Sequence, residues 1–369
     1  MKHSLFLMIL LLSLSCTSRS QAKRDSIIDT LSDSLSATDS ISPTDTLRLL
    51  FVGDLMQHQG QINAARTSTG YDYSTCFTYV KEEIGRADLA IANLEVTLGG
   101  KPYKGYPAFS APDEFLTAIH DAGFNVLVTA NNHSLDRGKS GLERTIQLID
   151  SLKIPHAGTY INTEERDKKY PLLLEKNGFR IALLNYTYGT NGIPVTPPNI
   201  VNYIDTTVIA KDIEESKAMK PDAIIACMHW GIEYQSLPDK EQKFLTDWLL
   251  RKGVNHIIGC HPHVVQPIEV REDSLTNGKH LVVYSLGNYI SNMSARRTDG
   301  GLMVKMELVK DSTTRLNHCE YSLVWTARPA QSGKKNHQLL PINFPTDSIS
   351  VNARNSLRIF ANDARSLFS

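Results

Sequence analysis

The chain has 369 residues, 41% of them hydrophobic, which is enough for one large domain or two small ones with a sizeable core. Lysine plus arginine and aspartate plus glutamate each total 39, so the formal net charge at pH 7 is zero. This balance argues against a nucleic-acid partner. The five cysteines show no Cys-x-x-Cys spacing, which indicates neither a disulfide framework nor a structural zinc site: Cys16, Cys76, Cys227, Cys260 and Cys319.

Residues 1–15 have the pattern of an export signal, with Lys2 and His3, an apolar run at 5–12, and small residues after it. The run is too short for a comfortable membrane span. Cys16 follows directly and resembles the acylated cysteine of bacterial lipoproteins, with Ser13 where that signal usually has leucine. The alternative is an ordinary cleaved signal peptide. We expect an exported protein of the cell envelope, anchored in a membrane by a lipid on Cys16.

Residues 16–46 are dominated by Ser, Thr and Asp, with only scattered apolar residues. Such a segment cannot bury enough surface to offset the entropy of ordering it, so we predict a disordered tether. The folded domain is expected at 47–345, followed by a C-terminal helical tail at 346–369.

Strand and helix patterns alternate from residue 47 onward, which predicts an α/β fold. Short apolar runs, typical of strands buried on both faces, occur at 47–52, 87–92, 126–130, 180–184, 223–228, 256–260 and 281–284. Helical periodicity occurs at 114–122, 140–152, 209–219 and 240–251. Weaker strand patterns at 302–309 and 321–325 precede a terminal helix at 353–367.

Polar side chains follow the ends of these apolar runs, where ligands bind in open α/β sheets. If the strands form a single sheet, its edge gathers carboxylate, amide and imidazole groups, which hold divalent Mn, Fe or Zn. Six candidate ligands exceed the needs of one four-coordinate ion, so we predict one or two ions, with a carboxylate shared if there are two. The candidates are Asp54, Glu95, Asn132, His229, His261 and His263.

His133 stands beside Asn132, which suits a proton donor next to a metal ligand. The alternative is a capped turn at 131–133 in which the asparagines bond the backbone. A polar, hydrogen-bonded sheet edge without metal is the alternative for the whole set. His261 and His263 are two residues apart, so both face one side if that segment is extended.

Several motifs carry a family resemblance: F-V-G-D-L-M at 51–56, A-N-L-E at 92–95, A-N-N-H-S-L-D at 130–136, H-W-G at 229–231, G-C-H-P-H-V-V-Q-P at 259–267 and Y-S-L-G-N-Y at 284–289. In order and spacing they resemble the CapA family, the bacterial capsule-synthesis proteins linked to poly-γ-glutamate. That family is similar to the calcineurin-like metallophosphatases. The resemblance therefore implies a four-layer αββα sandwich.

By resemblance, Asp54 is the first acidic ligand, Glu95 takes the bridging position, and Asn132 is the amide ligand. His133 is then the catalytic proton donor. His229, His261 and His263 correspond to the imidazole ligands.

This chain departs from the phosphatase pattern at two positions. Met56 stands where those enzymes usually have a histidine ligand, with His58 two residues further on, and Glu95 replaces the usual aspartate. The resemblance therefore does not by itself imply phosphatase activity.

We assign Asn93, Arg137 and Asn288, which flank the motif residues, to substrate binding. Arg137 is suited to pair with a carboxylate or phosphate. Lys101 and Lys104 either do the same or are solvated surface charges. Trp230 and Tyr234 either line the cleft or pack in the core.

Two classes of function fit these features. The first is a surface-anchored, metal-dependent hydrolase or transferase acting on an anionic envelope polymer such as poly-γ-glutamate. The second is a non-catalytic capsule assembly factor that binds the polymer or a membrane capsule synthase. A third, weaker interpretation is a phosphodiesterase, against which Met56 counts.

Overall fold

A computed structural model describes residues 45–273 and 278–368. The predicted signal sequence, Cys16 and nearly all of the predicted tether lie outside these residues. Asp45 and Thr46 belong to the first strand, where they pair with Lys310 and Val309. The folded part therefore begins at least two residues before the predicted boundary.

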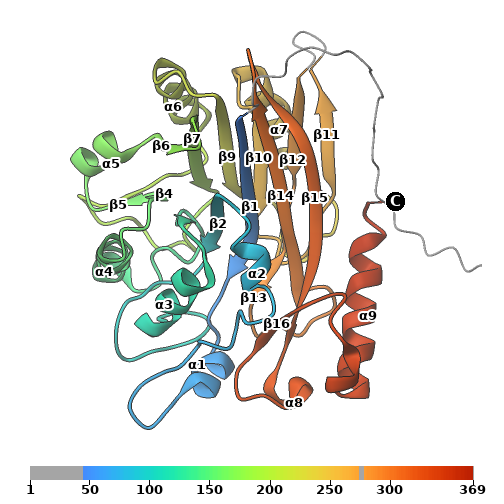
Figure 1. The fold of residues 1–369 in the computed structure, drawn as a ribbon. Helices are drawn as coiled ribbons and strands as arrows, with labels where there is room; N and C mark the ends of the chain where they lie inside the picture. The colour runs from blue at the N-terminus through green and yellow to red at the C-terminus, as the bar shows by residue number, and fades with distance from the viewer. Residues whose placement is uncertain (1–44, 274–277, 369) are drawn as a thin grey trace, which may run out of the picture. The chain divides into compact units, whose positions relative to one another are not determined.

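The first sheet has eight strands in the order β16-β15-β14-β1-β2-β3-β4, with β13 also paired to β1. Figure 1 shows β14 and β15 as long neighbouring strands beside β1. The bounds are β1 Asp45–Leu55, β2 Leu89–Leu94, β3 Val126–Val128, β4 His156–Ala157, β13 Asn288–Ile290, β14 Gly300–Lys310, β15 Thr314–Ala327 and β16 Gln338–Pro341.

The second sheet has six strands in the order β11-β12-β10-β9-β7-β6, and β5 pairs separately with β8. The bounds are β5 Thr159–Tyr160, β6 Leu172–Lys176, β7 Phe179–Thr187, β8 Ile200–Val201, β9 Ala223–His229, β10 His256–Cys260, β11 Ile268–Glu272 and β12 Lys279–Val283.

The helices are α1 Gln59–Ala65, α2 Lys81–Ile84, α3 Asp113–Ala122, α4 Gly138–Ser151, α5 Thr163–Lys169, α6 Thr206–Ala218, α7 Lys240–Lys252, α8 Pro329–Ser332 and α9 Val351–Arg365, with a 3-10 turn at Thr346–Ser348. The predicted helices at 114–122, 140–152, 209–219, 240–251 and 353–367 correspond to α3, α4, α6, α7 and α9, with ends within about three residues.

Three apolar clusters bind these elements into four layers. Between the sheets, Phe51 of β1 shares a cluster with Ile225 and Ile258 of the second sheet. Behind the first sheet, Val52 packs in a cluster with Phe115 of α3. Behind the second sheet, its strands pack against α6 and α7. The four-layer α/β arrangement implied by the family resemblance is therefore confirmed.

Strand β1 shows why a continuous apolar run in the sequence predicts a strand that is buried on both faces. Leu49 and Phe51 face the cluster between the sheets, whereas Leu50 and Val52 face the cluster behind the first sheet. Successive side chains of a strand point to opposite faces, so a strand covered on both sides must be continuously apolar.

The expectation of a single sheet is wrong. Strands β1, β2 and β3 lie in the first sheet, and β7, β9 and β10 lie in the second. A buried apolar run does not specify which strand it pairs with. Along the chain, the second sheet begins with the antiparallel pair β6–β7. The predicted ligands therefore come from two facing sheets.

The C-terminal segment is part of the core. Ala353, Leu357 and Phe360 of α9 belong to the cluster between the sheets, and α9 runs alongside β15 (Figure 1). In the two described ranges, 45–273 and 278–368, no helix is both long and apolar enough to cross a membrane.

Candidate metal centre

Asp54 lies near the end of β1, where that strand is paired in parallel with both β2 and β13. It pairs in register with Asn93 of β2 and Asn288 of β13. Gly53 permits the close approach of Gly287, since a Cβ at Gly53 would lie 1.9 Å from the carbonyl oxygen of Gly287. The Asn93 side-chain amide donates to Oδ1 of Asp54 at 2.8 Å. The strand pairing and the Asn93 hydrogen bond therefore fix the carboxylate of Asp54, which is fully buried.

The sequence places His261 and His263 on one side only if their segment is extended. The segment is not extended. Both residues have positive φ angles, 101° and 59°, in the left-handed region that costs a non-glycine residue about 1–3 kcal/mol. The backbone N–H of Tyr234 donates to the carbonyl of Pro262 at 2.8 Å. Such strained backbone is common at functional sites, and here it turns both imidazoles into the site.

His263 is oriented by two acceptors. Its Nδ1 lies 3.0 Å from Oδ2 of Asp54 and 3.0 Å from Oδ1 of Asn288. The Asn288 amide nitrogen donates to the carbonyl of Thr298 at 2.7 Å, which fixes its oxygen toward His263. Nδ1 therefore carries the proton, and the lone pair of Nε2 faces Glu95 at 3.9 Å.

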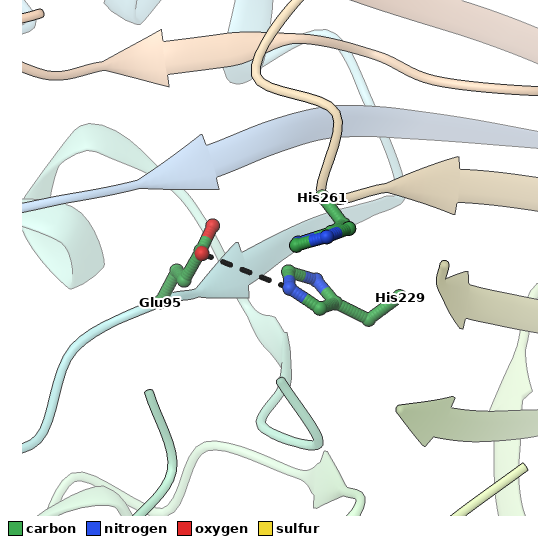
Figure 2. Close-up of side chains that lie close together, drawn as sticks. All are labelled: Glu95, His229 and His261. Atoms are coloured by element: carbon green, nitrogen blue, oxygen red, sulfur yellow. Dashed lines mark ion pairs between the residues drawn. The ribbon is translucent and has the colours of Figure 1, made fainter. Parts of the chain in front are cut away.

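Glu95 is shared by two groups of potential metal ligands. Glu95, His229 and His261 offer ligand atoms that all lie within 4.8 Å of one another, and so do Asp54, Glu95 and His263. Figure 2 shows the Glu95 carboxylate facing the two imidazole rings, with His229 Nε2 3.7 Å from Glu95 Oε1. A carboxylate common to two groups has the arrangement of a bridging ligand for two ions.

The electrostatics of these groups fit a cation. Neither carboxylate oxygen of the fully buried Glu95 accepts a hydrogen bond from any described residue, and His261 Nδ1 also has no partner among them. Burial, and then the Asp54 carboxylate, raise the pKa of Glu95 well above its usual range. An unpaired buried carboxylate is costly, and a divalent ion between these groups would relieve that cost.

The imidazoles are suited to be neutral ligands. Burial, and then the neighbouring imidazoles, lower the pKa of His229 well below its usual value. Burial lowers the pKa of His261 to about 3. Burial alone would raise the pKa of Asp54, but hydrogen bonds with His263 and Asn93 bring it below its usual value. The site thus holds His229 and His261 as neutral imidazoles beside an ionised aspartate, a donor set typical of Mn, Fe or Zn sites.

Asn132 faces the group that contains His229. Its Oδ1 lies 2.7 Å from His229 Nε2, and its amide nitrogen donates to Asn191 at 3.1 Å. Asn131 instead caps the turn, since its amide donates to the carbonyl of Leu94 at 2.8 Å and its oxygen accepts from the N–H of His133. The capped-turn interpretation therefore describes Asn131, whereas Asn132 points into the site.

His133 is held by a residue that the sequence analysis did not single out. Asp136 Oδ2 lies 2.7 Å from His133 Nδ1 and also accepts the N–H of Phe109 at 2.8 Å. The Phe109 ring packs against the imidazole at a centroid distance of 4.6 Å. An acid three residues after a candidate histidine was the available signal. With Nδ1–H donating to Asp136, the Nε2 atom of His133 is the one available for proton transfer.

The sequence comparisons identify the family. The profile of the family described as bacterial capsule synthesis protein PGA_cap matches residues 48–293, well over half of the chain. The chain belongs to this family. The resemblance predicted from the motifs is confirmed.

Two relatives of this capsule synthesis protein cover most of its length. It is 27% identical to "Capsule biosynthesis protein CapA" of Bacillus anthracis over 298 residues, which are 76% of this chain and 69% of the relative. It is 29% identical to "PGA biosynthesis protein CapA" of Bacillus subtilis (strain 168) over 280 residues, 73% of this chain and 70% of the relative.

Two solved structures match most of this chain at low sequence identity. The calcineurin-like phosphoesterase YfkN from Bacillus subtilis matches with a TM-score of 0.46 and 13% identity, covering 88% of this chain and 99% of that one. The NAD nucleotidase NadN of Haemophilus influenzae matches with a TM-score of 0.49 and 11% identity, covering 88% of this chain and 68% of that one. The family assignment rests on the sequence match.

In this capsule synthesis protein, neither Met56 nor the nearby His58 supplies a ligand in the groups found among the described residues. Met56 is buried in the apolar cluster behind the first sheet. His58 accepts the backbone N–H of Asn292 at its Nδ1 at 3.3 Å, and burial lowers its pKa to about 4. His58 belongs to neither ligand group found among the described residues. The Asp54 group therefore offers fewer imidazoles than the His229 group.

The residues assigned to substrate binding take different positions. Asn93 and Asn288 are buried and hydrogen-bonded to Asp54 and His263, which favours an orienting role over direct contact with substrate. Arg137 packs its side-chain carbons close to Gly99. Its guanidinium has no ion pair among the described residues. Arg137 thus stays a candidate for binding an anion.

Aromatic residues line part of the site. Trp230 is buried and donates to the carbonyl of Tyr284 at 2.9 Å, so it is a core residue. Tyr234 is 54% exposed and its ring lies 6.2 Å from that of His263. Tyr188, which the sequence analysis did not single out, is 48% exposed with its ring 4.4 Å from that of His261. The two tyrosines form an exposed aromatic rim beside the ligands.

Proposed function

We propose that this member of the capsule synthesis family is a metal-dependent hydrolase or transferase that acts on an anionic envelope polymer. The observation that carries the proposal is Glu95, a buried carboxylate without a hydrogen-bond partner among the described residues, shared by two groups of potential ligands. Two relatives named CapA, one of them a "PGA biosynthesis protein", support a capsule polymer such as poly-γ-glutamate as the substrate class.

The residues have separable roles in the proposed reaction. Asp54, Glu95 and His263 would hold one divalent ion, and Glu95, His229, His261 and Asn132 a second. When bound, such ions supply a water of lowered pKa and polarise the scissile bond. His133 would hold a proton at Nε2 for the leaving group, and Asp136 would keep the ring in the orientation and tautomer that this requires.

The experiment that tests this proposal is metal removal and reloading. The full chain is treated with a chelator, dialysed, and reloaded with Mn, Fe or Zn, and the length of poly-γ-glutamate chains is followed by gel filtration. We expect shortening of the polymer to require one of these ions. No change in polymer length with any of the three ions would contradict the hydrolase, and the same polymer offered with an amine acceptor tests for transfer.

We also propose that the protein is exported and held at a membrane through Cys16, on the basis of the signal-like start and the polar segment after it. Cys16→Ala should move the protein from the membrane fraction to the soluble fraction of the envelope, because the lipid attachment point is lost. Cys319→Ala, a change in the folded domain, is the matched control. Equal membrane retention of wild type and Cys16→Ala would rule out the lipid anchor.

A further inference from the structure

A surface pocket of about 460 Å³ lies between α1 and the loop that follows β2. Arg66 and Lys101 contribute cationic side chains to its lining, and Tyr71 and Tyr103 contribute aromatic rings. The two rings meet edge to face with a centroid distance of 5.2 Å. The pocket thus combines positive charge with a fixed apolar wall.

The two cations are available to a ligand. Arg66 and Lys101 are both exposed, and neither side chain forms an ion pair or a hydrogen bond with another described residue. Among nearby acids, Asp113 already forms an ion pair with Arg144, with 2.7 Å between Asp113 Oδ1 and Arg144 Nη1. Glu114 lines an adjoining pocket that shares Tyr71 with this one, together with Asp72 and Asp121.

The pocket is physically connected to the candidate catalytic histidine. Gln59, which also lines the pocket, accepts the backbone N–H of Gly105 at 3.4 Å. His58, the residue before it, packs on Phe109 at a centroid distance of 5.2 Å, and Phe109 packs on His133. Two successive ring contacts therefore lead from the residue beside the pocket to His133.

We propose that this Arg66/Lys101 pocket is a subsite that binds a carboxylate-bearing segment of the polymer next to the bond that reacts. The inference rests on the proposed function for its substrate class. Arginine and lysine form charge-assisted hydrogen bonds with carboxylates, and the tyrosine rings offer a surface for the methylene groups between them. A chain of γ-linked glutamates has this alternation of carboxylate and methylene groups.

The test is binding of a fluorescently labelled γ-linked glutamate oligomer to the metal-free full chain, measured by anisotropy. The double variant Arg66→Gln/Lys101→Gln should bind about tenfold more weakly or worse, because two charge-assisted contacts are lost. Arg86→Gln/Lys211→Gln removes two exposed cations outside the pocket and should leave affinity unchanged. Glu114→Gln should bind more tightly than wild type, because it removes one negative charge from the adjoining pocket.

The outcomes separate the subsite from its alternatives. Equal weakening in the two double variants would overturn the proposal in favour of bulk charge attraction. Polyphosphate binding that is tighter than the glutamate oligomer and equally dependent on Arg66 and Lys101 would overturn the assignment to carboxylates. Pocket-dependent binding without any metal-dependent cleavage would sustain the subsite and contradict the hydrolase. Metal-dependent cleavage together with unchanged affinity in the Arg66→Gln/Lys101→Gln variant would support the hydrolase and contradict the subsite.

Discussion

In the metal-free protein, Glu95→Gln should raise the free energy of unfolding at pH 7 by about 1–3 kcal/mol, although the change is made at the centre of the site. Glutamine has nearly the same shape as glutamate but carries no charge, so it removes the cost of a buried carboxylate with no hydrogen-bond partner among the described residues. Thermal and urea unfolding of both proteins in chelator measure the effect. Glu82→Gln, at an exposed ion pair, is the control and should change little.

The pH dependence of this difference has a defined sign. Burial and the Asp54 carboxylate raise the pKa of Glu95 in the folded chain, whereas in the unfolded chain it is about 4.3. A group whose pKa is raised on folding stabilises below its unfolded pKa, and that stability is lost as pH rises through the folded value. The advantage of Glu95→Gln should therefore be smallest near about pH 4 and grow toward neutral pH.

Divalent metal should reverse the order of the two proteins. At a concentration of Mn or Zn about 1,000 times its dissociation constant, wild type should gain about 4.1 kcal/mol, and Glu95→Gln should gain far less because the shared ligand has lost its charge. Equal stabilisation of both proteins by metal would show that Glu95 is not a ligand. A metal-free variant less stable than wild type would show that the carboxylate is satisfied by some other partner.

His133→Ala should lower polymer cleavage by about 10²–10⁴-fold while metal content stays at the wild-type level. His133 lies outside both ligand groups, so its loss removes a proton donor and no ligand. Asp136→Asn should lower activity less and alter the pH profile, because Nδ1–H loses its charged acceptor but Nε2 remains. Metal analysis alongside the cleavage rate separates the two roles.

The control for this series is His120→Ala, which changes an exposed histidine on α3. It should leave cleavage, metal content and melting temperature near wild type. Unaltered capsule formation in cells carrying His133→Ala would contradict the catalytic role, and it is the result expected of a non-catalytic assembly factor that binds polymer or a capsule synthase.

The sequence predicted the chain positions of the ligands well because each polar ligand candidate stands at or just after the end of a buried apolar run. Continuous apolar runs such as β1 and β9 are recognisable without partners, and Asp54 and His229 stand at their ends. The structure brings all six candidate ligands to one place. Within each sheet the ligands share an edge because parallel strands end on the same side, whereas the facing of the two sheets was implied only by the family resemblance.

Other features depend on contacts that periodicity does not encode. The division into two sheets is set by pairing partners, which a buried strand does not specify. The positive φ angles of His261 and His263 accompany a hydrogen bond from the N–H of Tyr234 to the carbonyl of Pro262 between them, and nothing local in G-C-H-P-H requires them. Tyr188 reaches the site from a loop after β7, where tyrosine by itself is no signal.

The most direct test of the two-ion site is the metal content of the wild-type protein purified without chelator, measured by mass spectrometry together with Glu95→Gln, His229→Ala and His263→Ala. We expect wild type to retain Mn, Fe or Zn, Glu95→Gln to retain the least, and each histidine variant to lose only part of the metal. A wild-type metal content no higher than that of Glu95→Gln would contradict the metal centre.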